Sequence, residues 1–531
     1  MQPVGNPHFH GIPWRGNGCR LFDQRPQIEF RCAAKEPYEM NILLIYPKFP
    51  DTFWSFSYAL RFIGKKLAFP PLGLITVAAL LPEQFQMRLV DLNVEALGDD
   101  DLAWADMAFI SAMAVQRESA VQVIDRCKVK GLKIVAGGPL FTSQPNDFGQ
   151  VDHLVLDEAE ATLPAFLTDL KNGCPKQLYR AEDYPEIRSS PIPLWSLIDI
   201  RSYASLNIQY SRGCPFNCEF CNITALFGHK PRTKTPQQVT AELDAIYREG
   251  WRGSIFFVDD NFIGNKRSLK QHLLPALIKW RQDKKGCAFF TESSINLADD
   301  PELMDMMAEA GFDAVFIGIE TPEPDSLAEC CKTQNTNRDL LCDVKKIHRS
   351  GLQVMGGFIV GFDSDPPSIF QRQIDFIQQS GIVTAMVGML QAIPGTRLFE
   401  RLAGEQRVYE DFSGDNVDGR TNIIPAMGLE KLTDGYRAIM QHIYSPRNYY
   451  QRVRHILKEL KEPSVTSSAD WQRVFAFWRA CLRLGVLGKE RFQYWRLLAW
   501  TLTRRPRLLS LAVTLAIYGY HYRRICELHI L

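Results

Sequence analysis

The chain has 531 residues, of which 46% are hydrophobic and 23% are charged. These values exclude a single small module and a largely disordered chain, and the length predicts about three or four folding units. The formal net charge of +1 argues neither for nor against a polyanionic partner, but the charge is unevenly distributed. Residues 441–531 hold sixteen Lys or Arg and only five Asp or Glu, so the last part of the chain is strongly basic.

The cysteine content and the N-terminal sequence predict a cytoplasmic protein. Thirteen scattered cysteines are too few for a disulfide scaffold, which favours a reducing compartment. The sequence shows no basic-then-apolar signal peptide, and no apolar run approaches the roughly 18 residues of a spanning helix. Residues 1–39 are rich in Pro, Gly and Arg without periodicity. We expect them to form a disordered leader, or to lie upstream of the true start at Met40.

Short apolar strands alternate with helical segments over residues 40–180. Strands are predicted at 41–46, 86–90, 107–111 and 133–136, and helices at 71–81 and 119–130. This alternation predicts an α/β domain with a doubly wound, Rossmann-like parallel sheet, which binds ligands at the carboxyl ends of its strands. Gly137, Gly138 and Pro139 directly follow one strand, where a backbone without Cβ atoms lets a phosphate or ribose approach closely. A plain turn is the alternative.

A second α/β domain is predicted over residues 201–402. Three prolines between Asp183 and Pro193 indicate an interdomain linker over 181–200. Six βα units then fit a partial (βα)6 TIM barrel, whose chemistry lies at the carboxyl ends of its strands. The predicted strands are 206–210, 254–258, 287–291, 314–319, 353–360 and 385–390. Residues 403–531 are expected to form a mostly helical, basic C-terminal domain.

Three cysteines follow the first strand of the predicted barrel. Cys214, Cys218 and Cys221 stand at C-x3-C-x2-C spacing. Three thiolates on one loop can ligate three irons of a 4Fe-4S cubane and leave the fourth iron open to a substrate, whereas a fourth cysteine would close it. A tetrahedral zinc site is the competing interpretation, and it needs a fourth ligand, for which only His229 lies nearby. Buried cysteines that are close by chance are the remaining alternative.

The triplet, Phe220 before its last cysteine and the six βα units resemble the radical S-adenosylmethionine (SAM) enzymes, over about residues 206–401. The resemblance implies that the three cysteines hold the cluster and that its open iron chelates the methionine end of SAM. Electron transfer then cleaves the sulfonium to a 5′-deoxyadenosyl radical. The resemblance also implies SAM contacts from Phe220, Asp259, Asp260, Glu292, Ser293, Glu320, Gly357, Gly361 and Pro394. Helix N-capping is the alternative role for the two aspartates.

A doubly wound domain directly before such a barrel resembles the cobalamin-binding subfamily of these enzymes. The resemblance covers about residues 41–170, and it implies a corrinoid across the strand ends that is bound by Leu72, Gly73, Ser111, Gly137, Gly138 and Pro139. Two features depart from the family pattern. Residues 47–54 lack a D-x-H-x-x-G motif, so no histidine there can bind cobalt, and Asp157 stands where relatives usually have Gly. A Rossmann-like scaffold without cobalamin is the alternative.

The basic tail mixes Arg with Trp, Tyr and Leu over residues 473–479, 491–496 and 504–520. This composition is typical of helices at an anionic bilayer surface and predicts a peripheral membrane contact. Nucleic acid is a less favoured partner, because the segment is more apolar than a solvated binding arm requires. Helices packed over the barrel mouth are a third interpretation. The domain order and the extension resemble the group that contains the hopanoid C-2 methylase, which implies a lipid-like substrate.

The leading hypothesis is a cobalamin-dependent radical SAM enzyme that methylates an unactivated carbon of a lipid-like or polycyclic substrate, with electrons from a flavodoxin- or ferredoxin-type donor. A C–H carbon has no lone pair with which to attack a sulfonium, so radical activation replaces nucleophilicity. A radical SAM cyclase, oxidase or rearrangement enzyme without methyl transfer is the second hypothesis. A non-catalytic iron-sulfur regulator that binds membrane or nucleic acid is the third. The sequence assigns no catalytic residue.

Overall fold

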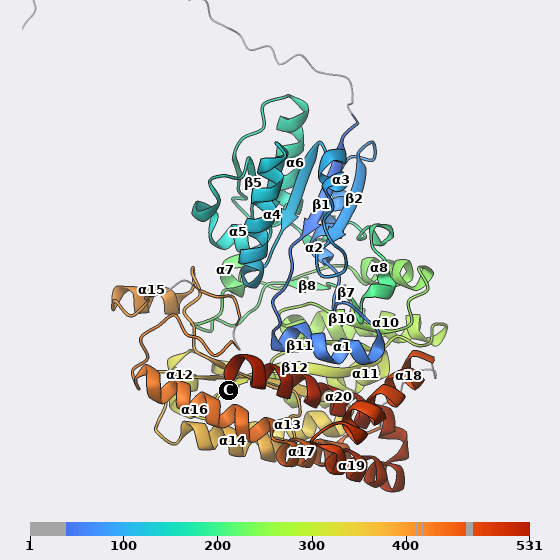
Figure 1. Cartoon of the computed structure of the whole chain (residues 1–531), viewed down its shortest axis with the longest axis vertical. Coiled ribbons are helices and arrows are strands. Elements are labelled where there is room, and N and C mark those ends of the chain that lie inside the picture. The colour runs from blue at the N-terminus through green and yellow to red at the C-terminus, as the bar shows by residue number, and fades with distance from the viewer. Residues whose placement is uncertain (1–38, 410–411, 416–417, 463–470) are drawn as a thin grey trace, which may run out of the picture.

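The computed structural model describes residues 39–409, 412–415, 418–462 and 471–531 (Figure 1). The predicted leader at residues 1–39 lies outside this range except for Glu39. A parallel sheet near the N-terminus stands on a second parallel sheet, and the C-terminal helices lie at the opposite end of the molecule (Figure 1). None of the helices in the described ranges is both long enough and apolar enough to cross a bilayer.

The first sheet is parallel throughout, with the strand order β2-β1-β3-β4-β5-β6. Ile42 and Leu44 point into one apolar core, and Leu43 and Ile45 into another, so the first strand is buried on both faces. Such a strand appears in a sequence as an unbroken apolar run. The strands are β1 (Asn41–Tyr46), β2 (Gln86–Asp91), β3 (Met107–Ser111), β4 (Lys133–Gly137), β5 (His153–Val155) and β6 (Leu178–Tyr179).

Helices cover both faces of this sheet. Residues of α2 (Leu72–Leu80) and α6 (Ala159–Lys171) join the core on one face. The other face packs on α3 (Asp99–Trp104), α4 (Arg117–Val129) and α5 (Pro139–Ser143). The doubly wound prediction is therefore confirmed. The strand order reverses between β1 and β3, and the carboxyl ends at such a reversal form the ligand-binding edge of this class of sheet.

The second sheet is an open, six-stranded parallel barrel wall with the order β14-β13-β12-β11-β10-β7. The predicted (βα)6 architecture is confirmed, although β11 begins at Phe289 rather than at Cys287. The strands are β7 (Ser205–Ile208), β10 (Ser254–Phe257), β11 (Phe289–Ser293), β12 (Phe312–Glu320), β13 (Gln353–Val360) and β14 (Ala385–Met389). The main outer helices are α8 (Pro236–Arg248), α10 (Leu274–Gln282), α11 (Pro301–Ala310), α13 (Leu340–Ser350) and α14 (Ile369–Ser380).

Residues 47–71, between β1 and α2, leave the first sheet and run to the far side of the barrel; we name them the β1–α2 excursion. Its helix α1 (Ser57–Ile63) packs against the C-terminal helices α18 (Trp471–Ala480) and α20 (Leu509–Ile525), as Figure 1 shows. The chain then returns beside the edge strand β7, where the Ala204 N–H donates to the Leu67 carbonyl (2.9 Å). One loop of the first domain thus contacts both other parts of the molecule.

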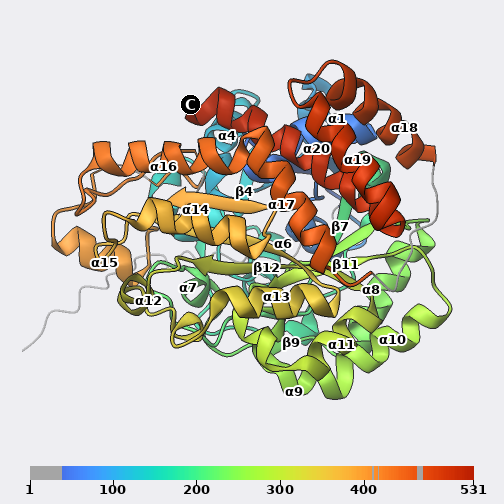
Figure 2. The same cartoon turned by 90° about the horizontal axis from the view of Figure 1, so that it is seen from below.

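The C-terminal extension is helical, as predicted. Its helices are α15 (Arg397–Gly404), α16 (Leu429–Tyr444), α17 (Pro446–Glu459), α18, α19 (Arg491–Arg504) and α20. α16 and α17 pack on the barrel helix α14 (Figure 2). The buried guanidinium of Arg452 fastens this contact by donating to the carbonyls of Ile382 (2.9 Å) and Ile443 (2.7 Å), which offsets the cost of burying its charge.

Phe53→Ala tests how firmly the excursion is anchored. The Phe53 ring is fully buried between Tyr444 and Tyr522, with ring centroids 5.6 and 5.1 Å away. Loss of this side chain leaves a cavity that costs about 3–5 kcal/mol of the free energy of unfolding, which urea denaturation followed by circular dichroism measures. Val129→Ala, at a side chain that is 85% exposed, is the control and changes it by less than about 0.5 kcal/mol. Equal losses in the two variants would contradict the anchoring role.

Candidate functional site

The cysteine loop lies between the short hairpin strand β8 (Ser211–Arg212) and α7 (Ile223–Phe227). The turn at Gly213 needs glycine, because its φ is +92° and a Cβ there would lie 2.9 Å from the carbonyl oxygens of Gly228 and Lys230. The Glu219 N–H donates to the Cys330 carbonyl (2.9 Å), and the Leu398 N–H donates to the Glu219 carbonyl (3.1 Å). Backbone contacts from two distant segments thus fix the loop.

The three thiols of Cys214, Cys218 and Cys221 are half-buried and free of disulfides. Burial, and then the neighbouring thiols, raise the pKa of Cys221 to about 12, and burial also raises the pKa of Cys214. Side-chain amides face two of the sulfurs: Asn261 Nδ2 is 3.9 Å from Cys214 Sγ and Gln334 Nε2 is 3.7 Å from Cys218 Sγ. Because iron binds thiolate, a cluster held by these cysteines would require them to release their protons.

The donor set fits a cubane cluster better than the zinc alternative. His229, the fourth ligand that zinc would need, is exposed. Across the part of the chain that the structure describes, no three Cys, His, Asp or Glu side chains converge as ligands of one metal ion. A cubane cluster does not require its ligands to converge on one ion, since each thiolate binds a different iron.

Lys332 is a functional candidate that the sequence analysis missed. Its ammonium lies 2.6 Å from Glu320 Oε1 and 5.8 Å from the centre of the Phe220 ring. Burial alone would lower the pKa of Lys332, but Glu320 and the thiols of Cys218 and Cys221 more than offset this, and the pKa lies above its ordinary value. Lys332 therefore places a stable positive charge beside the cysteine loop. No motif marks it, because it comes from a loop more than a hundred residues further along the chain.

Glu320 reaches Lys332 through an unusual backbone at the end of β12. Its φ is +62°, in the left-handed region that non-glycine residues seldom adopt. A Cβ at Gly318 would lie 2.2 Å from Glu320 Oε1 and 2.7 Å from Lys332 Nζ. The ion pair therefore fills the space that glycine leaves at position 318.

Acidic side chains gather where β10 and β11 end. Asp259 is fully buried and accepts hydrogen bonds from the Tyr210 N–H (3.1 Å) and from the backbone and hydroxyl of Ser211, so its carboxylate fastens the end of β7. Asp260 and Glu292 differ, because the structure shows no hydrogen bond or ion pair from either side chain to a described residue. Asp260 Oδ2 is a buried oxygen without a partner.

Burial, and then repulsion by neighbouring carboxyls, raise the pKa of both members of this second pair. Burial, and then Asp259, raise the pKa of Asp260 to about 7, whereas burial, and then Asp260, raise the pKa of Glu292 to about 8. Two such carboxyls with an unpartnered oxygen are candidates to pair with a cationic group, which would favour their ionised form. Ser293 is also buried, but its hydroxyl lies 3.2 Å from the Ser294 carbonyl.

The remaining predicted SAM residues lie at the ends of later strands. Gly357 faces the barrel interior, where a Cβ would lie 3.0 Å from the ring of Phe316. Gly361 has a φ of +107°, and its N–H donates to Asp365 Oδ2 (2.8 Å). Pro394 is half-buried in the turn before α15. Among the described residues, no hydrogen bond or ion pair joins these three to Asp260 or Glu292.

The predicted cobalamin residues lie at the carboxyl edge of the first sheet. Ser111 and Gly137 are paired in register at the ends of β3 and β4. A Cβ at Gly137 would lie 2.5 Å from the Val155 carbonyl, and one at Gly138, whose φ is +89°, would lie 2.6 Å from Ser111 Oγ. Close strand packing alone therefore requires both glycines. Leu72 and Gly73 begin α2, Pro139 begins α5, and the missing Cβ of Gly73 faces open space.

A buried ion-pair network joins this edge to the cysteine loop. Arg212, two residues before Cys214, contacts Glu158 (2.6 Å) and Glu160 (2.9 Å), and Arg232 contacts Glu158 (2.6 Å). Burial alone would raise the pKa of Glu160, but Arg212 lowers it to about 2. Asp157, which precedes Glu158, has a φ of +62°, in the left-handed region that glycine adopts most readily.

Aromatic side chains line the inner face of the barrel wall, and we name this set the aromatic chamber. In β10 to β12, Ile255, Phe289 and Val315 pack outward in the core, whereas alternate residues are half-buried and point inward. These are Phe256, Phe290 and Phe316. Phe256 and Phe290 stack at 4.8 Å, Phe69 of the excursion lies 5.3 Å from Phe256, and Trp54 of the excursion, 40% exposed, lies 5.2 Å from Phe316.

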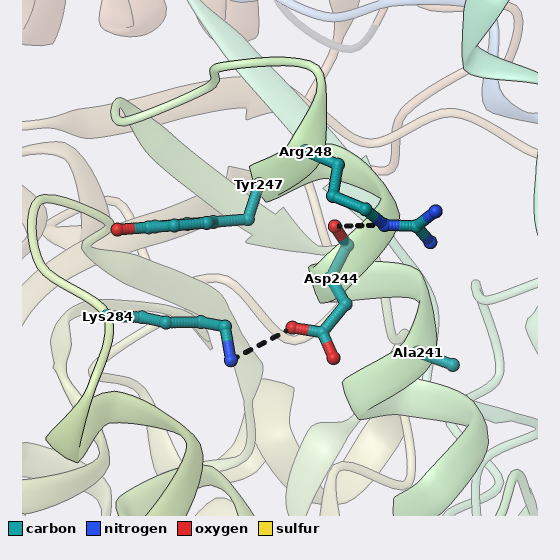
Figure 3. A pocket seen from close by; sticks show the side chains of 5 residues that line it. All are labelled: Ala241, Asp244, Tyr247, Arg248 and Lys284. Atoms are coloured by element: carbon teal, nitrogen blue, oxygen red, sulfur yellow. Dashed lines mark hydrogen bonds and ion pairs between the residues drawn. The ribbon is translucent and has the colours of Figure 1, made fainter.

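A separate surface groove lies on the outer side of α8, away from these residues. It is lined by Ala241, Asp244, Tyr247, Arg248 and Lys284, and Lys284 Nζ lies 3.1 Å from an Asp244 carboxylate oxygen (Figure 3). It contains none of the predicted site residues. The Arg248 side chain donates to the Asp244 carbonyl (3.3 Å), and the groove lies apart from the site.

Comparisons with known proteins agree with this architecture. Family models match over residues 208–377, described as the Radical SAM superfamily, and over 396–530, a domain of unknown function (DUF4070). An uncharacterized methyltransferase of Synechocystis is 40% identical over 92% of this chain and 92% of its own length. The hopanoid C-2 methylase of Rhodopseudomonas palustris is 34% identical over 86% of this chain and 88% of its own length.

A solved structure shows the same fold over most of the chain. It is the cobalamin-dependent S-adenosylmethionine radical enzyme OxsB with aqua-cobalamin bound, which matches with a TM-score of 0.61 at 14% identity. The match covers 92% of this chain and 80% of that chain. The two-sheet arrangement is therefore shared with a known enzyme despite the low identity.

Asp260→Asn tests the acidic pair. A raised carboxyl pKa means that the folded state keeps a proton that the unfolded state releases, so stability falls as the pH rises from about 4 to about 7. The amide of the variant cannot ionise, so this loss of stability does not occur. At pH 8 we expect the ligand-free variant to melt roughly 2–4 °C higher than wild type, which corresponds to about 1 kcal/mol of stability. At pH 4 the difference vanishes. The same variant should bind SAM more weakly by calorimetry.

Asp283→Asn, at an exposed carboxylate after α10, is the matched control and changes neither quantity. If Asp260→Asn left both the pH dependence of melting and the affinity for SAM unaltered, the pair would not be a cation site.

Proposed function

The chain belongs to the radical SAM superfamily, in the group that contains the hopanoid C-2 methylase, and we propose that it methylates an unactivated carbon of a lipid-like or polycyclic substrate. The predicted family and the prediction of a radical SAM enzyme are thereby confirmed. The observation that carries the substrate class is the aromatic chamber. Phe256, Phe290, Phe316 and Trp54 offer flat apolar surfaces, which suit a fused-ring or hydrocarbon substrate.

We assign Cys214, Cys218 and Cys221 to the 4Fe-4S cluster, and Asp260 and Glu292 to the cationic end of SAM. Cluster and SAM, when bound, supply a radical that removes hydrogen from carbon. The half-buried thiols and the unpartnered Asp260 oxygen support this assignment. Lys332 offsets negative charge on the thiolates, and the aromatic chamber excludes water from the reacting carbon.

We propose that cobalamin binds at the carboxyl edge of β1, β3 and β4 and carries the methyl group. The strand order supports this placement, because ligands of such sheets bind where the order reverses. The open space at Gly73 leaves the start of α2 free to contact a large ligand. Residues 47–71 contain no histidine, so the excursion offers no imidazole to the cobalt. The fold shared with OxsB adds support.

The other partners follow from this chemistry. Radical SAM enzymes need a reductant, and we propose a flavodoxin- or ferredoxin-type donor. We also propose a cytoplasmic enzyme at the periphery of a membrane, which the basic, aromatic C-terminal helices support.

Cys218→Ala tests the chemistry. Anaerobically reconstituted wild-type enzyme, supplied with reductant, SAM and methylcobalamin, should form 5′-deoxyadenosine and a substrate product heavier by one methylene, detected by mass spectrometry. Cys218→Ala loses a cluster ligand, so both products should fall below detection. Cys342→Ala, at an exposed cysteine on α13, is the control and retains both. Deoxyadenosine with a product of unchanged mass would favour a rearrangement enzyme, and no deoxyadenosine at all would favour a regulator.

Trp54→Ala tests the chamber. Loss of one aromatic wall should raise KM for a polycyclic substrate about tenfold, the equivalent of 1.4 kcal/mol, with kcat changed much less. Trp54→Phe should restore most of the affinity, because the flat surface returns. Leu178→Ala, at an exposed side chain on β6, leaves KM unaltered. An unchanged KM in Trp54→Ala would exclude this wall from substrate binding.

A further inference from the structure

Large apolar side chains are exposed along one C-terminal segment, α18 to α19. Of the twenty exposed large hydrophobic side chains that the described residues contain, nine lie within residues 474–502. They are Val474, Phe475, Trp478, Leu482, Val486, Leu487, Phe492, Trp495 and Leu502. Trp478 and Phe492 are 65% and 75% exposed. Soluble surfaces rarely gather apolar groups at this density unless they bind a partner.

These residues share the outward faces of two neighbouring helices. In α18 and the π-helical turn that follows it (Cys481–Val486), Ala480 and Leu484 point inward to the core, whereas Trp478 and Leu482 point outward. In α19, Tyr494 and Leu498 are buried and Phe492 and Trp495 are exposed. The two helices lie at an outer corner of the molecule, remote from the first sheet (Figures 1 and 2). We name this face the α18–α19 face.

Positive charge surrounds the exposed apolar side chains. Residues 473–507 contain nine Lys or Arg and one acidic residue, Glu490. Glu490 is buried and paired with Arg523, so it does not reduce the charge at the surface. Arg491 lies over the ring of the exposed Phe492, with its guanidinium carbon 5.2 Å from the ring centre. Glu462 pairs with two arginines at the end of this segment, and the other basic residues alternate with the exposed apolar ones along the sequence.

We propose that the α18–α19 face binds the surface of an anionic bilayer, with Trp478 and Phe492 at headgroup depth and the arginines on lipid phosphates. Interfacial helices combine these two kinds of side chain, and each basic residue near an anionic leaflet adds to the attraction. Charge argues against a second copy of the chain, because two such faces would bring together like charges. This proposal refines the membrane location proposed above, because it names the protein surface and the kind of lipid that it binds. It does not depend on the methyl transfer.

The α18–α19 face is also connected to the aromatic chamber. α18 packs on α1 of the excursion, and Arg479 donates to the Phe62 carbonyl (3.0 Å). The same excursion carries Trp54 against Phe316 inside the barrel. A protein bound through this face therefore holds the segment that forms one chamber wall close to the bilayer, where an apolar substrate is dissolved.

Vesicle flotation of the full-length protein tests the proposal. Wild type should bind vesicles of phosphatidylcholine with phosphatidylglycerol at low salt, release as salt screens the arginines, and bind pure phosphatidylcholine at least tenfold more weakly. Trp478→Ser/Phe492→Ser removes two inserted rings and should weaken binding about a hundredfold, or tenfold for each ring. The control is Val129→Ser/Leu178→Ser, at exposed side chains of the first domain, and it should bind as wild type does.

Three results would overturn the proposal. If the double variant binds anionic vesicles as tightly as wild type does, the α18–α19 face is not the membrane-binding surface. A wild-type dimer in sedimentation velocity that the double variant loses would assign it to a second copy. Displacement from anionic vesicles by equimolar duplex nucleic acid would assign it to that partner. Flotation needs no cluster, SAM or cobalamin, so a failure to float would not contradict the proposed chemistry. An inactive enzyme that still floats would not contradict the proposed membrane surface.

Discussion

Four buried charges fix the relation between the two sheets. Glu158 and Glu160 at the carboxyl edge of the first sheet pair with Arg212 and Arg232 on the hairpin beside the cysteine loop. Removal of one partner from such a pair leaves an uncompensated buried charge, so the arrangement resists separation. A group bound at the sheet edge and a group bound on the loop are therefore held at a constant distance, which a reaction between two bound cofactors and one substrate requires.

The β1–α2 excursion closes the other side of the same space. It leaves the first sheet at its ligand-binding edge, supplies Phe69 and Trp54 to the chamber and ends beside β7. The chamber is thus built from two domains, and the C-terminal helices hold the excursion in place through Phe53 and α1. Because the excursion supplies Trp54 and Phe69, a substitution in this segment alters the chamber without altering the barrel strands.

The sequence predicted the parts of the fold that local pattern determines. Strands buried on both faces, such as β1, β3 and β14, stand out as apolar runs, and the cysteine spacing carries its chemistry without a structure. The excursion was not predicted, because the burial of α1 depends on helices about 400 residues later in the chain. β5 and β6 were missed because two or three residues carry no periodicity.

The sequence predicted which kinds of residue form the candidate site, but it did not predict the role of each residue. Asp259 and Asp260 are adjacent and chemically identical in the sequence. Only the backbone decides that Asp259 turns inward to fasten β7 while Asp260 keeps an unpartnered oxygen. Lys332 could not be predicted from the sequence, because its importance comes from contact with Glu320 and Phe220 rather than from any motif.

The charged side chains also make the two ends of the site electrostatically different. At the ends of β10 and β11, Asp260 and Glu292 have no ion pair with any residue that the structure describes, whereas at the end of β12 the acid Glu320 is neutralised by Lys332. One end of the site thus attracts cations, and the other places an ammonium beside the cysteine loop. A cationic ligand group is therefore favoured at the ends of β10 and β11 over the position beside Lys332. The opposite placement would bring like charges together in a half-buried site, where the low dielectric makes that arrangement costly.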